Sequence, residues 1–308
     1  MRRVLIGLAL LFALLFLVLP LAVVFAGAFA KGWGAFAAAL AVPDTRHALF
    51  LTLLVTAVTV PVNVVFGLAF AWLVTRFRFR GRAFLLTLLD IPFAVSPVIA
   101  GLLYLLLYSE NAPLGAWFAA RGWQLMFAVP GIVLVTVFVT CPFVARELVP
   151  FMQQHGAAEE EAAVVLGASP WQLWRRITLP TILWPLLYGV ALTNARAVGE
   201  FGAVSVVSGN IRGATMTLPL NVELLYQDYQ AAAAFASAML LVCIALATLV
   251  LKAWVARHEE HVGVLRLFSY TSVSASFRRS CPRICVLRRA RWRHSWARPA
   301  AARRPCCA

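Results

Sequence analysis

Charged side chains are scarce in this sequence. They account for 13% of its 308 residues, whereas hydrophobic residues account for 62%. A soluble domain carries about 25% charged residues, and a globule of this size has too little interior to bury so much apolar surface. The scarcity of charge therefore excludes an ordinary soluble domain and predicts a protein that uses lipid as its solvent.

Lysine occurs only twice, as Lys31 and Lys252. Neither lysine follows a glycine-rich turn, and the sequence contains no Gly-x-x-x-x-Gly-Lys-Ser/Thr segment. A chain without this segment does not cradle ATP phosphates by the P-loop route. We therefore expect this chain to bind no cofactor of its own. If ATP drives the protein, ATP and Mg²⁺ are bound by a separate ATPase.

Residue patterns for catalysis and for metal binding are also missing. The stretch His258-Glu259-Glu260-His261 lacks the spacing of a zincin helix, and the cysteines after residue 280 lack zinc-site spacing. The sequence shows no nucleophile elbow and no paired-carboxylate site with a supporting context. These absences argue against an enzyme, including a membrane-embedded one, and predict no metal site.

Positive charge is concentrated at the C-terminal end. The formal net charge is +15, but the segment after residue 257 is rich in Arg, Ser and Cys and shows no apolar period. A basic block of this kind is typical of a disordered tail. We therefore expect a membrane domain in residues 1–257 and a basic, disordered or aberrant tail in residues 258–308. We expect membrane lipid as a partner and no nucleic acid.

Six long apolar runs are present in the predicted membrane domain. A spanning helix needs about 20 mostly apolar residues, and the runs are continuous, unlike the alternating strands of an outer-membrane barrel. Helices are expected because lipid leaves every backbone group to be satisfied within its own segment. The fold class predicted is therefore all-α, a polytopic membrane protein with about six transmembrane helices. The runs are residues 4–30, 48–75, 83–109, 122–145, 179–208 and 229–251.

The arginines orient these spans. The segment 76–82 holds four arginines, and short loops rich in Lys and Arg stay on the cytoplasmic side. This places both termini in the cytoplasm. Residues 4–30 also resemble a signal peptide ending in Ala28-Phe29-Ala30, but the run is longer than the roughly 7–15 apolar residues of a signal peptide. We expect it to be retained as an uncleaved anchor.

The cytoplasmic loop 150–181 has clear helix signals. Three consecutive glutamates from Glu159 open a run of helix formers, where the helix dipole favours acidic side chains. Gly167 is placed to end that helix. Ser169 and Pro170 then supply an N-cap and a first helical residue for a second helix. The sequence predicts helix, glycine turn and helix at the membrane surface.

The same loop carries a longer pattern: Glu-Ala-Ala, three residues, glycine, nine residues and Ile-x-Leu-Pro. This pattern resembles the EAA loop of binding-protein-dependent ABC importer permeases. The resemblance implies that the loop is the coupling helix, which sits in a groove of the ATPase subunit. It implies a polar contact from the glutamate, close approach at the alanines and a turn at the glycine. The residues are Glu161, Ala162, Ala163, Gly167, Ile177, Leu179 and Pro180.

Three further segments, residues 89–97, 139–150 and 194–204, resemble the sulfate/thiosulfate permeases, in particular their CysW-type subunit, and the similarity runs from about residue 4 to 257. The resemblance implies a MetI-like bundle in the bacterial inner membrane and sulfate or thiosulfate as cargo. It also implies a second permease subunit, two ATPase subunits and a periplasmic anion-binding protein. Molybdate permeases share much of the pattern, so another oxyanion remains an alternative. An ion-coupled secondary transporter fits less well because it has no coupling loop.

Asn194, Arg196 and Glu200 are polar residues of the predicted fifth span. A charge at the bilayer centre costs at least about 2.5–3.5 kcal/mol, so we expect them to face the bundle interior. Arg196 and Glu200 have the i, i+4 spacing of an ion pair. Two interpretations remain open: a place beside the translocation path, with Arg196 attracting a dianion and Glu200 holding a gate closed, or a salt bridge that fixes helix packing. Asp90 is expected to pair with Arg82 or a neighbour.

Two smaller expectations concern polar positions elsewhere. Asn63 follows Pro61 and is expected to satisfy backbone groups freed by a proline kink. Residues 209–228 are expected to form a solvated outer loop. That loop is also a candidate contact for the periplasmic protein.

Overall fold

The computed structural model describes residues 2–109, 111–248 and 250. Within these residues every regular element is a helix, as the sequence predicts. The predicted tail, residues 258–308, lies outside the described residues. The elements of the first half are α1 Arg2–Ala13, the π-helix η1 Leu14–Val18, α2 Leu19–Phe29, α3 Gly32–Ala41, α4 Pro43–Arg76, α5 Arg82–Ala94, α6 Pro97–Tyr108 and α7 Pro113–Ala119.

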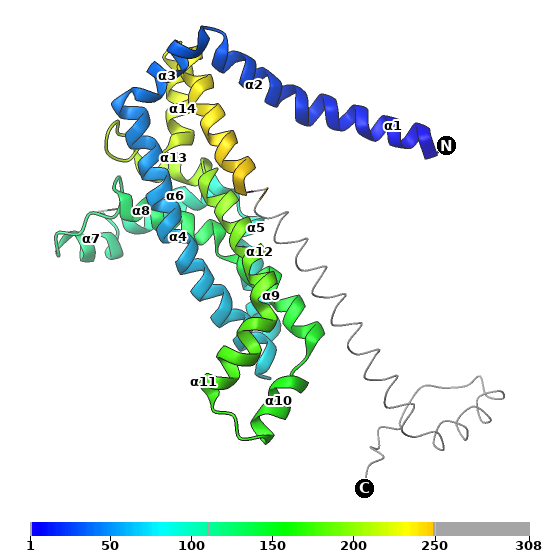
Figure 1. Ribbon diagram of the computed structural model, residues 1–308. Helices are drawn as coiled ribbons and strands as arrows, with labels where there is room; N and C mark the ends of the chain where they lie inside the picture. Colours follow the sequence, from blue (N-terminus) through cyan, green and yellow to red (C-terminus); the bar gives the residue numbers. More distant parts are fainter. Residues whose placement is uncertain (1, 110, 249, 251–308) are drawn as a thin grey trace. The chain divides into compact units, whose positions relative to one another are not determined.

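The second half holds a long loop that carries two short helices (Figure 1). Its elements are α8 Val129–Thr140, α9 Pro142–His155, α10 Ala158–Val165, α11 Pro170–Leu173, the π-helix η2 Trp174–Thr178, α12 Leu179–Val198, α13 Gly202–Ser208, α14 Leu218–Gln227 and a last helix Ala231–Thr248.

Five helices in the described residues are long and apolar enough to cross a membrane. They are Val4–Phe29, Pro43–Arg76, Val129–His155, Pro170–Val198 and Ala231–Thr248. Each covers or overlaps one of the predicted spans. The described part of the chain therefore holds five candidate spans, or six if the bent pair α5 and α6 forms one span.

The predicted third span, residues 83–109, is not one continuous helix. It divides into α5 and α6, which are bent by 103° at a short break. Val95 and Ser96 at the break have extended ψ angles of 132° and 136°. Pro97 explains this conformation, because a proline disfavours helical geometry in the residue before it and is well tolerated at the start of the next helix.

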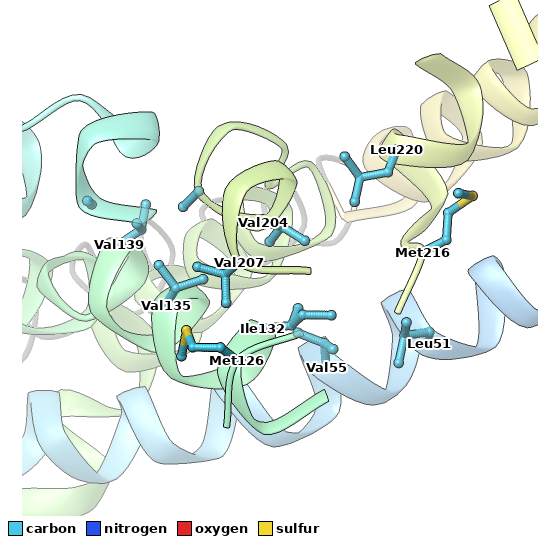
Figure 2. Close-up of a cluster of buried hydrophobic side chains, with 12 residues drawn as sticks. Leu51, Val55, Met126, Ile132, Val135, Val139, Val204, Val207, Met216 and Leu220 are labelled. Carbon is cyan, nitrogen blue, oxygen red and sulfur yellow. The ribbon is translucent and has the colours of Figure 1, made fainter. Parts of the chain in front are cut away.

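Helix α4 packs against α8, α9, α12 and α14 (Figure 1). One apolar cluster joins α4 to α8 and α13; Figure 2 shows Val55 beside Ile132, with Val204 and Val207 across from Val135. A second cluster joins α4, α9 and α12 nearer the loop that connects α9 to α12. These clusters hold the spans that lead to the loop.

Hydrogen bonds between helices add to this packing. The Asn63 amide Nδ2 donates to Thr140 Oγ1 at 2.6 Å, which links α4 to α8. The expectation that Asn63 satisfies backbone groups freed by the proline kink is therefore wrong, because its side-chain amide donates to a residue of another helix. The Leu218 amide donates to Thr52 Oγ1 at 2.8 Å and ties α14 to α4. The second half of the predicted outer loop is thus a packed helix, not a solvated loop, because its first turn is buried against α4.

Candidate functional site

The loop between α9 and α12 has the predicted helix–turn–helix form. α10 covers Ala158–Val165, and Gly167 has a φ of +83°. This left-handed conformation favours glycine, and the Gly167 and Ala168 amides donate to carbonyls of the last turn of α10. Ser169 then forms a capping box with Gln172, whose backbone amide donates to Ser169 Oγ while its side chain accepts from the Ser169 amide.

The tip of this loop is uncovered. Glu161 and Ala162 are exposed, and Val165 and Leu166 have relative exposures of 86% and 87%. Trp171 on α11 is 64% exposed and stacks on its neighbour one turn away. Apolar side chains gathered on a surface and flanked by acidic ones are typical of a protein–protein contact. The tip therefore has the chemistry of a docking surface.

The remaining residues of the Glu-Ala-Ala pattern lie at the other end of the loop. Ile177 and Thr178 form the end of the π-helix η2, which continues directly into α12. Leu179 packs on the second apolar cluster, and Pro180 lies in the first turn of α12, directly after the π-helix. The pattern thus combines an exposed tip with a base that is built into a span.

The base is joined to the tip by a residue that sequence reasoning missed, Glu160. Its Oε2 lies 2.7 Å from Arg76 Nε, and its Oε1 accepts hydrogen bonds from Arg76 Nη2 at 2.8 Å and from Thr178 Oγ1 at 3.0 Å. Glu160 and Thr178 are buried. The sequence does not indicate which of the three consecutive glutamates is buried. For Arg76 it suggested only a role in orienting the spans, as one of the four arginines of segment 76–82.

The predicted path residues are only partly brought together. Arg196 Nη1 lies 2.5 Å from Glu200 Oε2, so the predicted ion pair is present. Glu200 is not on the fifth span, however: α12 ends at Val198, and the Glu200 side chain accepts a hydrogen bond from the Ala203 amide at the start of α13. α13 begins only at Gly202, so the predicted single span to residue 208 is divided. Asn194 is half-buried on α12.

Asp90 has a different partner from the one expected. Arg146 Nε on α9 lies 3.7 Å from Asp90 Oδ1, and both side chains are more than half exposed. The Arg146 guanidinium also lies over the Phe93 ring, 4.6 Å from its centroid. This pair connects α5 to α9.

Among the described residues, no three His, Cys, Asp or Glu side chains are grouped to hold a metal ion.

The chain matches a known protein family. The sequence profile of the family described as "Binding-protein-dependent transport system inner membrane component" matches residues 32–263. This range contains the loop, both of its flanking spans and the Arg196–Glu200 pair.

Curated relatives cover most of the chain. The sulfate transport system permease protein CysW of Escherichia coli (strain K12) is 56% identical over 267 residues, which are 83% of this chain and 92% of the relative. The protein of the same name from Synechocystis sp. is 50% identical over 260 residues, 84% of this chain and 94% of the relative. The CysT permease protein of E. coli K12 is 39% identical over 236 residues, 76% of this chain and 85% of the relative.

Solved structures support the fold. A chain of a bacterial ABC transporter involved in the import of the acidic polysaccharide alginate superposes with a TM-score of 0.69 at 16% identity, covering 85% of this chain and 95% of that chain. The predicted importer-permease bundle of the MetI-like type is thereby confirmed. At this identity the likeness concerns the fold alone.

Proposed function

The chain belongs to the family of binding-protein-dependent transport system inner membrane components, and on that premise we propose that it is a permease subunit of an ATP-driven importer of sulfate. The observation that carries the proposal is the α10–α11 loop, which combines the complete Glu-Ala-Ala pattern with an uncovered tip. The names of its relatives, sulfate transport system permease proteins, support the cargo.

In this proposal the loop docks on a separate ATPase. Glu161 supplies a polar contact, Ala162 and Ala163 permit close approach, and the exposed Val165 and Leu166 supply apolar contact area. Gly167 sets the turn that presents this surface. Closure of the ATPase around ATP then moves the loop, and through it the spans α9 and α12.

The partners proposed are a second permease subunit, two ATPase subunits and a periplasmic anion-binding protein. The similarity to both CysW and CysT proteins supports a pair of related permease subunits. A solved relative of the same fold was studied in complex with a substrate-bound periplasmic protein. ATP and Mg²⁺ belong to the ATPase subunits, and both termini of this chain face the cytoplasm.

The anion is proposed to pass beside α12. Arg196 is one-third exposed, whereas its partner Glu200 is buried. The arginine can therefore meet an anion from the accessible side while the carboxylate holds it in place. Asn194 lies on the same helix and offers an amide donor. Each ligand shifts the inward–outward equilibrium only by its differential affinity for the two states.

The test is uptake of labelled sulfate into vesicles that contain this chain, its partner subunits and the binding protein. We expect uptake only with ATP, and we expect it to fall in a Gly167→Val variant that accumulates to the normal level. Competition with unlabelled thiosulfate and molybdate identifies the preferred oxyanion. Absence of ATP-dependent sulfate uptake by the wild type, with uptake of another oxyanion, would overturn the sulfate assignment.

A further inference from the structure

α10 is held on the bundle by an unusual contact. Of its eight residues, Glu160 alone is buried. Its two neighbours Glu159 and Glu161 are exposed, although they carry the same side chain. Short helices normally dock through apolar side chains. Here the docking side chain is a carboxylate, so the contact depends on charge and hydrogen bonding.

The carboxylate of Glu160 is well satisfied. Arg76 approaches it through Nε and Nη2, at 2.7 and 2.8 Å from its two oxygens, and Thr178 donates a hydroxyl at 3.0 Å. The Nη2 contact is a charge-assisted hydrogen bond, which is roughly twice as strong as a neutral one, and the Nε contact is an ion pair without hydrogen-bond geometry. The Arg76 and Glu160 side chains have relative exposures of 15% and 12%, so water screens this pair little.

The three side chains come from three different parts of the bundle. Arg76 is the last residue of α4, Glu160 lies in the first turn of α10, and Thr178 directly precedes α12. Arg76 and Glu160 are separated by 84 positions in the sequence. The cluster therefore ties the loop to α4, a span to which it has no direct chain connection, as well as to α12.

We infer that Arg76, Glu160 and Thr178 form a polar clamp that makes α10, the inner end of α4 and the base of α12 move as one body during transport. This inference rests on the proposed function and deepens it. Motion received at the exposed tip reaches two spans at once. Without the clamp, α10 swings on its glycine-flanked connections, and ATP hydrolysis proceeds without moving the bundle. Glu160 is thus a positioning residue, distinct from the exposed Glu161 that meets the partner.

The test uses the assembled complex with Glu160→Gln, and Glu159→Gln as the matched control on the same helix. Sulfate uptake and ATP hydrolysis are measured together. We expect Glu160→Gln to lower the sulfate moved per ATP by roughly tenfold, within the range of ordinary coupling between two sites, while hydrolysis continues. Glu159→Gln keeps the wild-type ratio. The charge-exchanged pair Arg76→Glu with Glu160→Arg restores part of the ratio.

Thr178→Val provides a milder variant, because it removes one hydrogen bond and keeps the ion pair. It is expected to lower the same ratio by a smaller factor, and it serves if Glu160→Gln prevents assembly. An unchanged ratio in assembled Glu160→Gln or, failing assembly, in Thr178→Val overturns the inference while leaving the proposed function intact. A wild type that shows no ATP-driven anion uptake overturns both.

Discussion

The backbone of Gly67 on α4 lies directly against Val144 on α9. A Cβ placed on Gly67 would stand 2.7 Å from the Val144 Cβ and 3.0 Å from the next backbone nitrogen. Real Cβ atoms essentially never approach so closely, so a side chain here must push the two helices apart. Small residues that allow close backbone approach are the usual basis of helix packing in membranes.

Gly67→Ala is therefore expected to destabilise the bundle by about 1–3 kcal/mol through overpacking. Thermal unfolding of the detergent-solubilised protein measures the effect. Gly34→Ala is the control, since a Cβ there meets nothing within 4 Å. Equal melting temperatures for Gly67→Ala and Gly34→Ala contradict this packing account.

The glycine turn of the loop makes a conformational prediction. A Cβ on Gly167 meets nothing within 4 Å, so its φ of +83° alone restricts substitution. A non-glycine residue in this region costs roughly 1–2 kcal/mol, and asparagine tolerates it better than β-branched residues do. We expect Gly167→Val to lower ATP-driven uptake and Gly167→Asn to retain most of it, at equal protein levels. If both variants transport equally well, the turn conformation does not matter.

The Arg196–Glu200 pair can be separated into packing and transport roles. Removing Arg196 alone leaves Glu200, which is 2% exposed, as an unpaired buried charge, and breaking a buried pair costs about 3–5 kcal/mol. Because Arg196 is one-third exposed, the cost is expected below that range. We expect Arg196→Met to lower protein levels, and Arg196→Met with Glu200→Gln to restore them, because glutamine still accepts from the Ala203 amide.

Uptake by this double variant then decides between the two interpretations of the pair. Normal levels with no sulfate uptake support a place beside the path. Normal levels with normal uptake show that the pair serves packing alone.

The Asp90–Arg146 pair is expected to contribute little to stability. Arg146 Nε and Asp90 Oδ1 are 3.7 Å apart, a long distance for an ion pair, and pairs that reach water are worth about 0–1 kcal/mol. We expect Asp90→Asn to leave the protein level and melting temperature almost unchanged. Arg146→Ala should cost more, because it also removes the contact with the Phe93 ring. A large loss in Asp90→Asn would show that the pair is buried in the assembled complex.

Sequence reasoning succeeded where local chemistry decides. Apolar run length located the long spans, and glycine, serine and proline signals predicted both helices of the loop together with the turn at Gly167. Each of these signals acts through the residue's own backbone or its nearest neighbours. The ion pair of Arg196 and Glu200 was also predicted from their i, i+4 spacing, although α12 ends at Val198, before Glu200.

It failed where tertiary contacts decide. The clamp joins Arg76 to Glu160 across 84 positions, and helix propensity treats all three glutamates of α10 alike. The bond from Asn63 to Thr140 and the partner of Asp90 likewise depend on which helices are neighbours. The sequence predicted one span over residues 83–109 and not the sharp break before Pro97, because a proline in a membrane helix is compatible with either a mild kink or a full break.

Contact between the loop tip and a separate ATPase is the central claim, and cross-linking tests it most directly. A photoreactive amino acid is placed at Leu166, which is 87% exposed, or at Tyr229 between α14 and the last helix, which is 96% exposed, in a complex first shown to transport. We predict a cross-link to the ATPase subunit from position 166 and none from position 229. A transporting complex with no cross-link from position 166 would contradict the coupling role of this loop.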